Sequence, residues 1–244
     1  MADQLTMEDE GYNLTEDPED LPLVYRDAIC DRLFVEFLKL SEEREGKNHA
    51  ILKVDFKDNV DGSYEGARIM MTVEFEITIV ESNGSRSAHQ PGKLLVKPVK
   101  YQQASHKSIR TCEVSIAPGL SLGYIIDTLL RSNLHYFYFI TIHGQYFGCR
   151  DFVAQALHVL ERAQCINPGI EDSTGDSPTP FVFDIHDTLG MRYTRDSVAV
   201  SPMDRGHFPY YTRIEAPYMP YYGCPRVLDI ETMVNRYNMF RRPR

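Results

Sequence analysis

The chain has 244 residues, of which 43% are hydrophobic and 25% charged, and its formal net charge is −9 at pH 7. Eight of the acidic residues lie within residues 1–20, which contain no Lys or Arg, so the remainder holds 27 acids against 26 bases. This near neutrality excludes the bulk electrostatic attraction that nucleic-acid binding needs, and no nucleic-acid partner is expected. Residues 1–20 are predicted to form a disordered acidic tail.

The sequence predicts a soluble, cytoplasmic protein with no membrane partner. The N-terminus lacks the positive region and apolar run of a signal peptide. No segment approaches the roughly 18 apolar residues that a membrane span requires. The five cysteines are odd in number, scattered and without a Cys-x-x-Cys pair, which indicates reduced thiols rather than a disulfide framework.

The first half of the chain is predicted to form an antiparallel sheet behind a helix. Apolar residues spaced by three and four predict a helix over residues 22–45, ended by Gly46. Alternating apolar and polar residues predict strands over residues 50–56, 69–80, 94–99 and 112–116. Pro98 favours an edge position for its strand, because proline cannot donate a ladder hydrogen bond.

The second half is predicted to add two helices and a strand to the same domain. Ser121 is a suitable N-cap for a helix, the aromatic residues 134–142 favour a strand, and a second helix starts at about Arg150. A mobile loop near 168–180 follows, and then a Tyr/Pro-rich C-terminal wrap with a short helix from Asp229. Residues 21–244 are therefore predicted to be a single α+β domain, an antiparallel sheet flanked by helices.

The segment from Tyr146 to Val153 is the most informative one for function. Gly148 and Cys149 stand where a strand-like aromatic run gives way to a helix. The positive end of the helix dipole and the neighbouring Arg150 favour a thiolate, which is the nucleophilic form of cysteine. Cys149 is therefore a candidate nucleophile, with backbone amides at the helix start as an oxyanion site.

This segment resembles the permuted papain-like proteins, which include the lecithin retinol acyltransferase and NlpC/P60-like families. In that group a histidine on a strand precedes a cysteine that opens a helix. Cys149 and Phe152 match the Asn-Cys-x-x-Phe block of the group, whereas Gly148 replaces the Asn and Asp151 stands where His is frequent. The resemblance implies a permuted papain-like fold with Cys149 as nucleophile. Residues 136–160 are also similar to uncharacterised fungal proteins with a Gly-Cys-Arg helix start.

A cysteine nucleophile needs a histidine base, and the sequence leaves its identity open. The predicted strand 69–80, where a permuted enzyme could carry this histidine, contains none. Upstream of Cys149, the histidines considered are His89, His106 and His143, of which His143 comes just before the turn that leads to the cysteine. Downstream, His186 follows a short apolar run and has acidic neighbours, and His207 lies in the Tyr/Pro-rich segment. The predicted catalytic residues are Cys149, His143 and His186.

Cys149 and its neighbours Arg150 and Asp151 also have a purely structural interpretation. Cys149 could be a small buried residue under a tight turn, with Gly148 present because the backbone needs a positive φ or a close approach. Asp151 is predicted to be the helix N-cap, and Arg150 to form a surface ion pair or to contact a ligand.

Cofactor and metal sites have no sequence support. No His-x-x-x-His or Cys-x-x-Cys spacing occurs, and no phosphate-binding glycine motif is present, so neither a metal nor another cofactor is expected. The Tyr/Pro-rich segment could instead offer an aromatic surface to a protein or small-molecule partner. The predicted binding residues on that surface are Tyr210, Tyr211, Tyr218, Tyr221 and Tyr222.

Two functions remain open on the sequence alone. The leading expectation is a binding domain, a degenerate papain-like fold without turnover. The alternative is a cysteine hydrolase or acyltransferase that uses Cys149 and a nearby histidine. The two differ in geometry, because an enzyme needs a histidine within hydrogen-bond reach of an accessible Cys149 sulfur.

Overall fold

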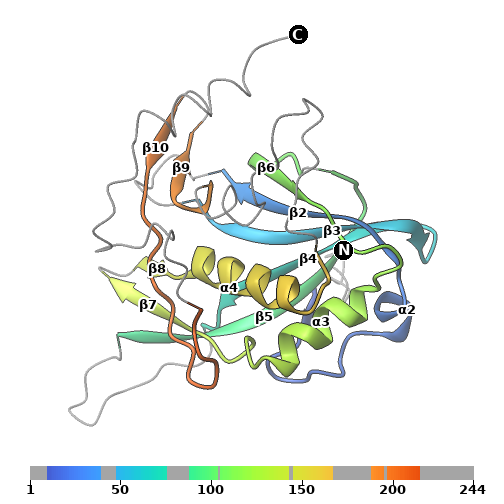
Figure 1. Cartoon of the computed structure of the whole chain (residues 1–244), viewed down its shortest axis with the longest axis horizontal. Coiled ribbons are helices and arrows are strands. Elements are labelled where there is room, and N and C mark those ends of the chain that lie inside the picture. Colours follow the sequence, from blue (N-terminus) through green and yellow to red (C-terminus); the bar gives the residue numbers. More distant parts are fainter. Residues whose placement is uncertain are drawn as a thin grey trace, which may run out of the picture.

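The protein is built on one large antiparallel sheet with helices packed on one of its faces. The computed structural model describes residues 10–39, 48–75, 88–103, 105–142, 145–166, 188–194 and 197–214. Within these residues the sheet has eight strands in the order β6-β2-β3-β4-β5-β7-β8, with β1 paired to β5. Helices α3 and α4 lie across one face of this sheet (Figure 1). The α+β class and the antiparallel sheet are as predicted.

The sheet consists of β1 (Tyr12–Asn13), β2 (Cys30–Leu38), β3 (Ala50–Val60), β4 (Tyr64–Val73), β5 (His89–Val99), β6 (Ser108–Val114), β7 (Tyr138–Ile142) and β8 (Gln145–Phe147). The described helices are α2 (Leu23–Arg26), α3 (Leu122–Arg131) and α4 (Cys149–Arg162). A separate hairpin is formed by β9 (Met191–Tyr193) and β10 (Val198–Val200). All of these strand pairs are antiparallel.

The predicted helix over residues 22–45 is wrong. Only the short α2 is helical in the described part of this stretch, and it is followed by β2, which pairs with β3 and β6. Residues 33–37 are all buried, so both faces of β2 are covered. A nearly continuous run of apolar residues contains both the spacing of three and four typical of a helix and the alternation typical of a strand. The aromatic and β-branched residues in the run favour the strand.

The other strands overlap the predicted ones with different bounds, since β4 begins at Tyr64 and ends at Val73 and β6 ends at Val114, and α3 agrees with the predicted helix. The strand predicted from Ala50 is β3, and it extends to Val60. Ser121 is the N-cap of α3, and its side chain accepts a hydrogen bond of 3.2 Å from the Tyr124 amide. β5 is an interior strand rather than an edge strand, since β4 pairs with one side of it and β1 and β7 with the other. Pro98 lies beyond Val96, the last residue that pairs with β1, so its missing amide interrupts no ladder on that side.

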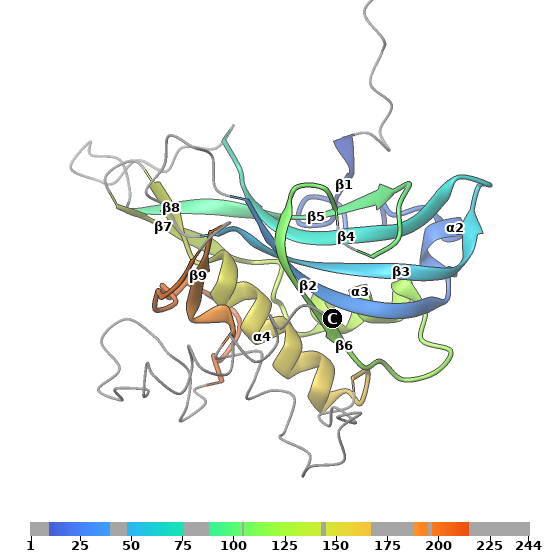
Figure 2. The ribbon, with the colours of Figure 1, turned by 90° about the horizontal axis from the view of Figure 1, so that it is seen from above.

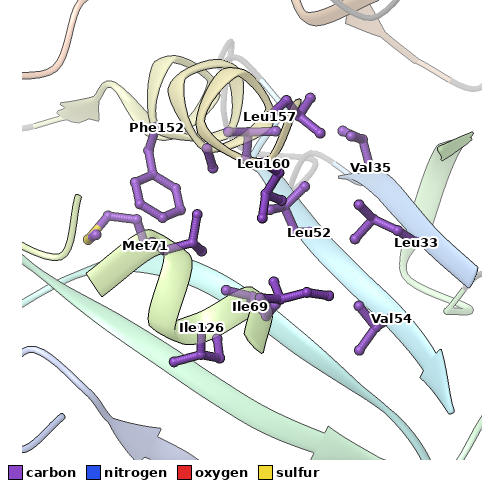
Figure 3. Close-up of a cluster of buried hydrophobic side chains, with 14 of the residues drawn as sticks. Leu33, Val35, Leu52, Val54, Ile69, Met71, Ile126, Phe152, Leu157 and Leu160 are labelled. Atoms are coloured by element: carbon purple, nitrogen blue, oxygen red, sulfur yellow. The ribbon is translucent and has the colours of Figure 1, made fainter. Parts of the chain in front are cut away.

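The core lies between the sheet and the two longer helices. Alternate residues of β2, β3 and β4 point toward Ile126 of α3 and toward Phe152, Leu157 and Leu160 of α4 (Figure 3). The strand residues in this layer are Leu33, Val35, Leu52, Val54, Ile69 and Met71, each at most 1% exposed. Burying such side chains stabilises the fold by about 1.5–3 kcal/mol each and fixes α4 on the sheet.

The predicted disordered tail does not hold for its second half. Tyr12 and Leu14 are 5% and 0% exposed, and β1 pairs with β5 through the register Tyr12 with Val96. The apolar side chains within this acidic segment bury enough surface to order it. Residues 1–9 lie outside the described residues.

Helix α4 is covered on both sides. Its residues 150–160 are all buried, because the sheet packs on one side and residues 188–214 pack on the other. Gln155 joins α4 to this C-terminal segment, donating to the Ile214 carbonyl and accepting from the Tyr211 hydroxyl. Figure 2 shows β9 beside the N-terminal half of α4. Among the described residues no helix is long and apolar enough to cross a membrane.

Candidate active site

The chain turns sharply into α4 at Gly148. This residue has a φ of 125°, and a Cβ atom placed on it would lie 2.9 Å from Phe137 Cζ and 3.1 Å from Gly206 Cα. The sequence predicts a positive φ or a close approach here, and the structure has both, which together require glycine. The turn places Cys149 at the first position of α4, where backbone amides lack carbonyl partners within the helix.

The structure brings His49 to Cys149. His49 immediately precedes β3, and its side chain shares a hydrogen bond with the Cys149 thiol. The amide of Ala50 also donates to the Cys149 sulfur. Both residues are only partly buried, and Cys149 packs against the hydrophobic core. This is the cysteine–histidine contact that an enzyme requires.

The interaction between Cys149 and His49 lowers the pKa of the thiol and raises the pKa of the imidazole, which favours the charged form of each. Burial alone would raise the pKa of Cys149, but the charge of His49, the hydrogen bonds from His49 and Ala50, and the charge of Arg150 lower it from 9.0 to about 7. Burial would likewise lower the pKa of His49, yet the interaction with Cys149 raises it above its ordinary value, against a smaller opposing effect of Arg68. A thiolate and an imidazolium are therefore favoured near neutral pH.

Arg150 does not form the predicted surface ion pair, because it is 3% exposed. Its guanidinium donates to the carbonyls of Leu189, Met191 and Ser201 at 2.7, 2.9 and 3.1 Å, and to the Ser201 hydroxyl at 3.2 Å. Arg150 therefore binds the β9–β10 hairpin and the residues that flank it, and its buried charge favours the thiolate next to it. The pattern Gly-Cys-Arg did not reveal that the partners of Arg150 are backbone carbonyls far along the chain.

Asn48 attaches the other half of the pair to the same hairpin. It is fully buried, and its side-chain amide donates to the carbonyls of Leu38 and Tyr193 at 3.0 and 2.9 Å. Its side-chain oxygen accepts from the Tyr193 amide at 2.6 Å. The residues adjacent to His49 and to Cys149 thus both bind β9, at Tyr193 and at Met191 respectively. This arrangement holds the histidine and the cysteine in register.

Asp151 is not the helix N-cap that the sequence predicted. The N-cap is Gly148, and the Asp151 carboxylate is fully buried in the first turn of α4. It accepts two hydrogen bonds from the Arg213 guanidinium, one of them at 2.8 Å, and one from the Gly206 amide at 2.7 Å. This ion pair fixes residues 206–213 against the start of α4, next to Gly148.

Most of the other predicted site residues lie in parts of the chain that the structure does not describe. His143 and His186, and with them Tyr218, Tyr221 and Tyr222, lie outside the described residues. His89 belongs to β5 rather than to a polar loop, and its ring lies 5.3 Å from that of His207. Of the two described tyrosines, Tyr210 is 68% exposed, whereas Tyr211 packs against the core and donates to Gln155.

Residues 56–209, more than half of the chain, match the family model described as "Domain of unknown function (DUF7770)". The chain belongs to the DUF7770 family. The matched region includes Cys149, Arg150 and β9, whereas His49 precedes it. No curated protein and no solved structure matches the chain.

His49 is the residue of this DUF7770 chain that sequence reasoning missed. The resemblance to permuted enzymes suggests a histidine on the predicted strand over residues 69–80. Between the incorrectly predicted helix over 22–45 and the predicted strand from residue 50, His49 falls in a connection. A usable signal existed, because His49 directly precedes the alternating residues of β3 and precedes Cys149 in the chain. A histidine that opens a strand upstream of a cysteine at a helix start is the order seen in the resembling families.

Metal chemistry finds no support in the described part of the DUF7770 chain. Those residues contain no group of three or more His, Cys, Asp or Glu side chains that could hold a metal ion. The described cysteines Cys30, Cys112, Cys149 and Cys165 are all free thiols. Of these, Cys30 is 3% exposed and burial raises its pKa to about 12, so its environment is the opposite of that of Cys149.

Proposed function

We propose that this protein is a cysteine hydrolase or acyltransferase with Cys149 as nucleophile and His49 as general acid and base. The observation that carries the proposal is the hydrogen bond between the His49 side chain and a partly exposed Cys149 whose pKa is lowered to about 7. Support also comes from the order of the elements, since a histidine at a strand start precedes a cysteine that opens a helix on an antiparallel sheet. This order fits the permuted papain-like resemblance.

The first half of the reaction follows from the protonation states. The Cys149 thiolate attacks the carbonyl carbon of an ester, thioester or amide, and the carbonyl electrons move to oxygen. The amides at the start of α4 face the region where this oxyanion forms, and the helix dipole favours its negative charge. When the tetrahedral intermediate collapses, the leaving group takes the proton of the His49 imidazolium, and an acyl thioester remains on Cys149.

The second half returns the enzyme to its starting state. His49, now neutral, removes a proton from water or from an acceptor nucleophile, which attacks the thioester carbonyl. The carbon–sulfur bond breaks, and the thiolate is restored beside the imidazolium. Water as acceptor gives hydrolysis, and an alcohol or amine gives acyl transfer.

The test is the rate at which iodoacetamide alkylates Cys149, measured by mass spectrometry for each cysteine as a function of pH. We expect the rate to rise with a midpoint near pH 7, while Cys30 stays unlabelled. In His49→Asn the thiolate fraction at pH 6.5 should fall by about 50-fold, because the pKa of Cys149 returns to its ordinary range or above. His89→Asn, which changes an exposed histidine on β5, is the matched control and should behave as wild type.

Turnover is tested with p-nitrophenyl acetate and the same variants. Wild type should accumulate an acetyl thioester on Cys149 that can be trapped by acid, and Cys149→Ser and His49→Asn should not. A midpoint near pH 9 in wild type, or equal rates in wild type and His49→Asn, would remove the basis of the proposal.

A second candidate function is the non-catalytic binding domain. It is favoured by an exposed aromatic pair, Tyr136 and Tyr210, which are 41% and 68% exposed with ring centroids 5.1 Å apart. Large rigid rings of this kind are frequent at the centres of protein interfaces. Rapid alkylation of Cys149 without any acyl thioester would favour this alternative over an enzyme.

A further inference from the structure

A second exposed aromatic pair lies at the end of the sheet. Phe75, just after β4, is 71% exposed, and Tyr146 of β8 is 39% exposed. Their ring centroids are 5.6 Å apart with an interplanar angle of 76°, which is the favoured edge-to-face geometry. Two large rings that contact each other and remain exposed form an apolar surface with area left to bury.

Both rings lie on the face of the sheet that carries α4. Ile69 and Met71 point to this face, and alternation along β4 extends the same side toward Phe75. Phe139 is buried on this face, alternation places Thr141 on it too, and Thr141 pairs directly with Tyr146. The contact between Phe75 and Tyr146 agrees with both assignments.

The pair also lies at the same end of the sheet as Cys149 and His49. Since Leu52 of β3 pairs with Ile69 of β4 in an antiparallel register, the start of β3 lies beside the end of β4. His49 precedes the first of these ends and Phe75 follows the second. Tyr146 is in the strand that leads through Gly148 directly into Cys149.

The two described strands that hold and flank Tyr146 carry no charged residue. The sequence of β7 and β8 contains no Asp, Glu, Lys or Arg. Phe75 has two acidic neighbours in the sequence: Glu74 lies on the alternate side and forms an ion pair of 3.3 Å with Lys93 of β5, and Glu76 lies outside the described residues. A substrate group that covers Phe75 and Tyr146 would therefore meet the apolar area of the two rings.

We propose that Phe75 and Tyr146 form an acyl-binding subsite of the Cys149–His49 centre, which selects an uncharged, apolar acyl group. The proposal rests on the proposed function, and it adds the class of substrate. The apolar group covers the two rings while its carbonyl carbon lies at the Cys149 sulfur. Its affinity comes from apolar area removed from water, so a charged acyl group is disfavoured.

The test compares three alkylating reagents that share one reaction, in which the thiolate displaces iodide and forms a thioether. The reagents are iodoacetamide, N-benzyl-2-iodoacetamide and iodoacetate, and each rate on Cys149 is divided by the rate on glutathione. For wild type we expect the benzyl reagent to exceed iodoacetamide by about fivefold, and iodoacetate to be the slowest. In Phe75→Ser and Tyr146→Ser the benzyl preference should fall toward one.

The control is Tyr124→Ser, which removes a 47% exposed ring on α3 and should keep the wild-type preference. Urea unfolding of all variants verifies that each is folded. Rapid labelling of Cys149 with no benzyl preference in wild type, or with the same preference in all variants, overturns the subsite and leaves the proposed function standing. Slow labelling by every reagent overturns the proposed function, and the subsite with it.

Discussion

The two faces of the sheet each bury ionisable side chains, and they do so in different ways. On the face of α4, Cys149 and His49 form a pair that is partly exposed. On the opposite face, alternation places Glu36, Lys53 and Asp55 under the chain between β5 and β6. We call these three residues the outer cluster.

The outer cluster satisfies its charges several times over. Asp55, 1% exposed, accepts hydrogen bonds from Lys53, from Arg32 at 2.8 Å and from the Gln103 amide at 3.1 Å. Glu36 accepts from the Ser105 amide at 2.9 Å and from Arg68 at 3.3 Å. The Lys53 ammonium also lies 5.2 Å from the centre of the Tyr101 ring, within the range of a cation–π contact.

The difference between the faces separates structure from reactivity. In the outer cluster each carboxylate is bound by fixed donors, so its charge is held in place and has no access to a substrate. In the Cys149–His49 pair the sulfur has two hydrogen-bond partners, His49 and the Ala50 amide, and under the proposed function it is the atom that attacks a carbonyl carbon. A charged pair with few hydrogen bonds is therefore a better candidate for a reactive site than a charge that fixed donors satisfy.

The largest effect should come from breaking the outer cluster. Asp55→Ala leaves Lys53 and Arg32 without their carboxylate, and we expect the free energy of unfolding to fall by about 3–5 kcal/mol. Urea denaturation measures this change. Asp31→Ala is the control, since this carboxylate also faces Arg32 but is 61% exposed and should cost less than about 0.5 kcal/mol.

The same variant tests whether the two faces are separate. The rate of Cys149 alkylation at pH 7 should stay as in wild type in Asp55→Ala. If this rate fell together with stability, the outer cluster would belong to the reactive site and the distinction between the faces would not stand.

A smaller effect on both quantities is expected for Asn48→Ala. This change removes the hydrogen bonds to Leu38 and Tyr193, and we expect a loss of about 2 kcal/mol in unfolding free energy. Because His49 loses its attachment to β9, Cys149 alkylation at pH 6.5 should slow by about tenfold. Asn59→Ala, on an exposed position of β3, should change neither measurement. Loss of stability with an unchanged alkylation rate would show that Asn48 does not position His49.

The smallest effect concerns Lys53. Burial lowers its pKa from 10.5 to about 8, so between these pH values the unfolded chain binds more protons than the folded one. Stability must then rise with pH across this interval. We expect the free energy of unfolding of wild type, relative to Lys53→Met, to increase by on the order of 1 kcal/mol from pH 8 to pH 10. The exposed Lys57→Met is the control and should show no such trend against wild type. A flat or falling difference would contradict the lowered pKa.

The sequence predicted the fold where one face of an element is polar. The strand from Ala50, the helix capped by Ser121 and the helix that starts at Cys149 all show a clear period, and each was found. It failed at β2, where apolar residues occupy both faces and remove the period that distinguishes a strand from a helix. It also failed at Tyr12 and Leu14, because local acidity hid two side chains that pack on the sheet.

Of the two residues of the pair, only Cys149 was predictable from the sequence. Cys149 carries a local signal, because glycine and a helix start are visible in neighbouring residues. His49 reaches Cys149 through the antiparallel sheet, and Asn48 and Arg150 reach β9 across intervals of 145 and 41 residues. Such contacts depend on strand order, which local patterns do not encode. The same limit explains why the sequence predicts an N-cap at Asp151, whereas its partner Arg213 lies 62 residues away.

The attachment of both site residues to β9 also bears on the order of events during synthesis. Cys149 leaves the ribosome before Met191, Tyr193 and Ser201, the last of which follows Arg150 by 51 residues. Until that hairpin has emerged and docked, Arg150 has no carbonyl partners and His49 is not held at the sulfur. The nascent thiol therefore keeps the ordinary pKa of a free cysteine and is mostly protonated at neutral pH. A chain that is still being made thus lacks the contacts through which Asn48 and Arg150 attach the pair to β9, and these contacts form only in the finished fold.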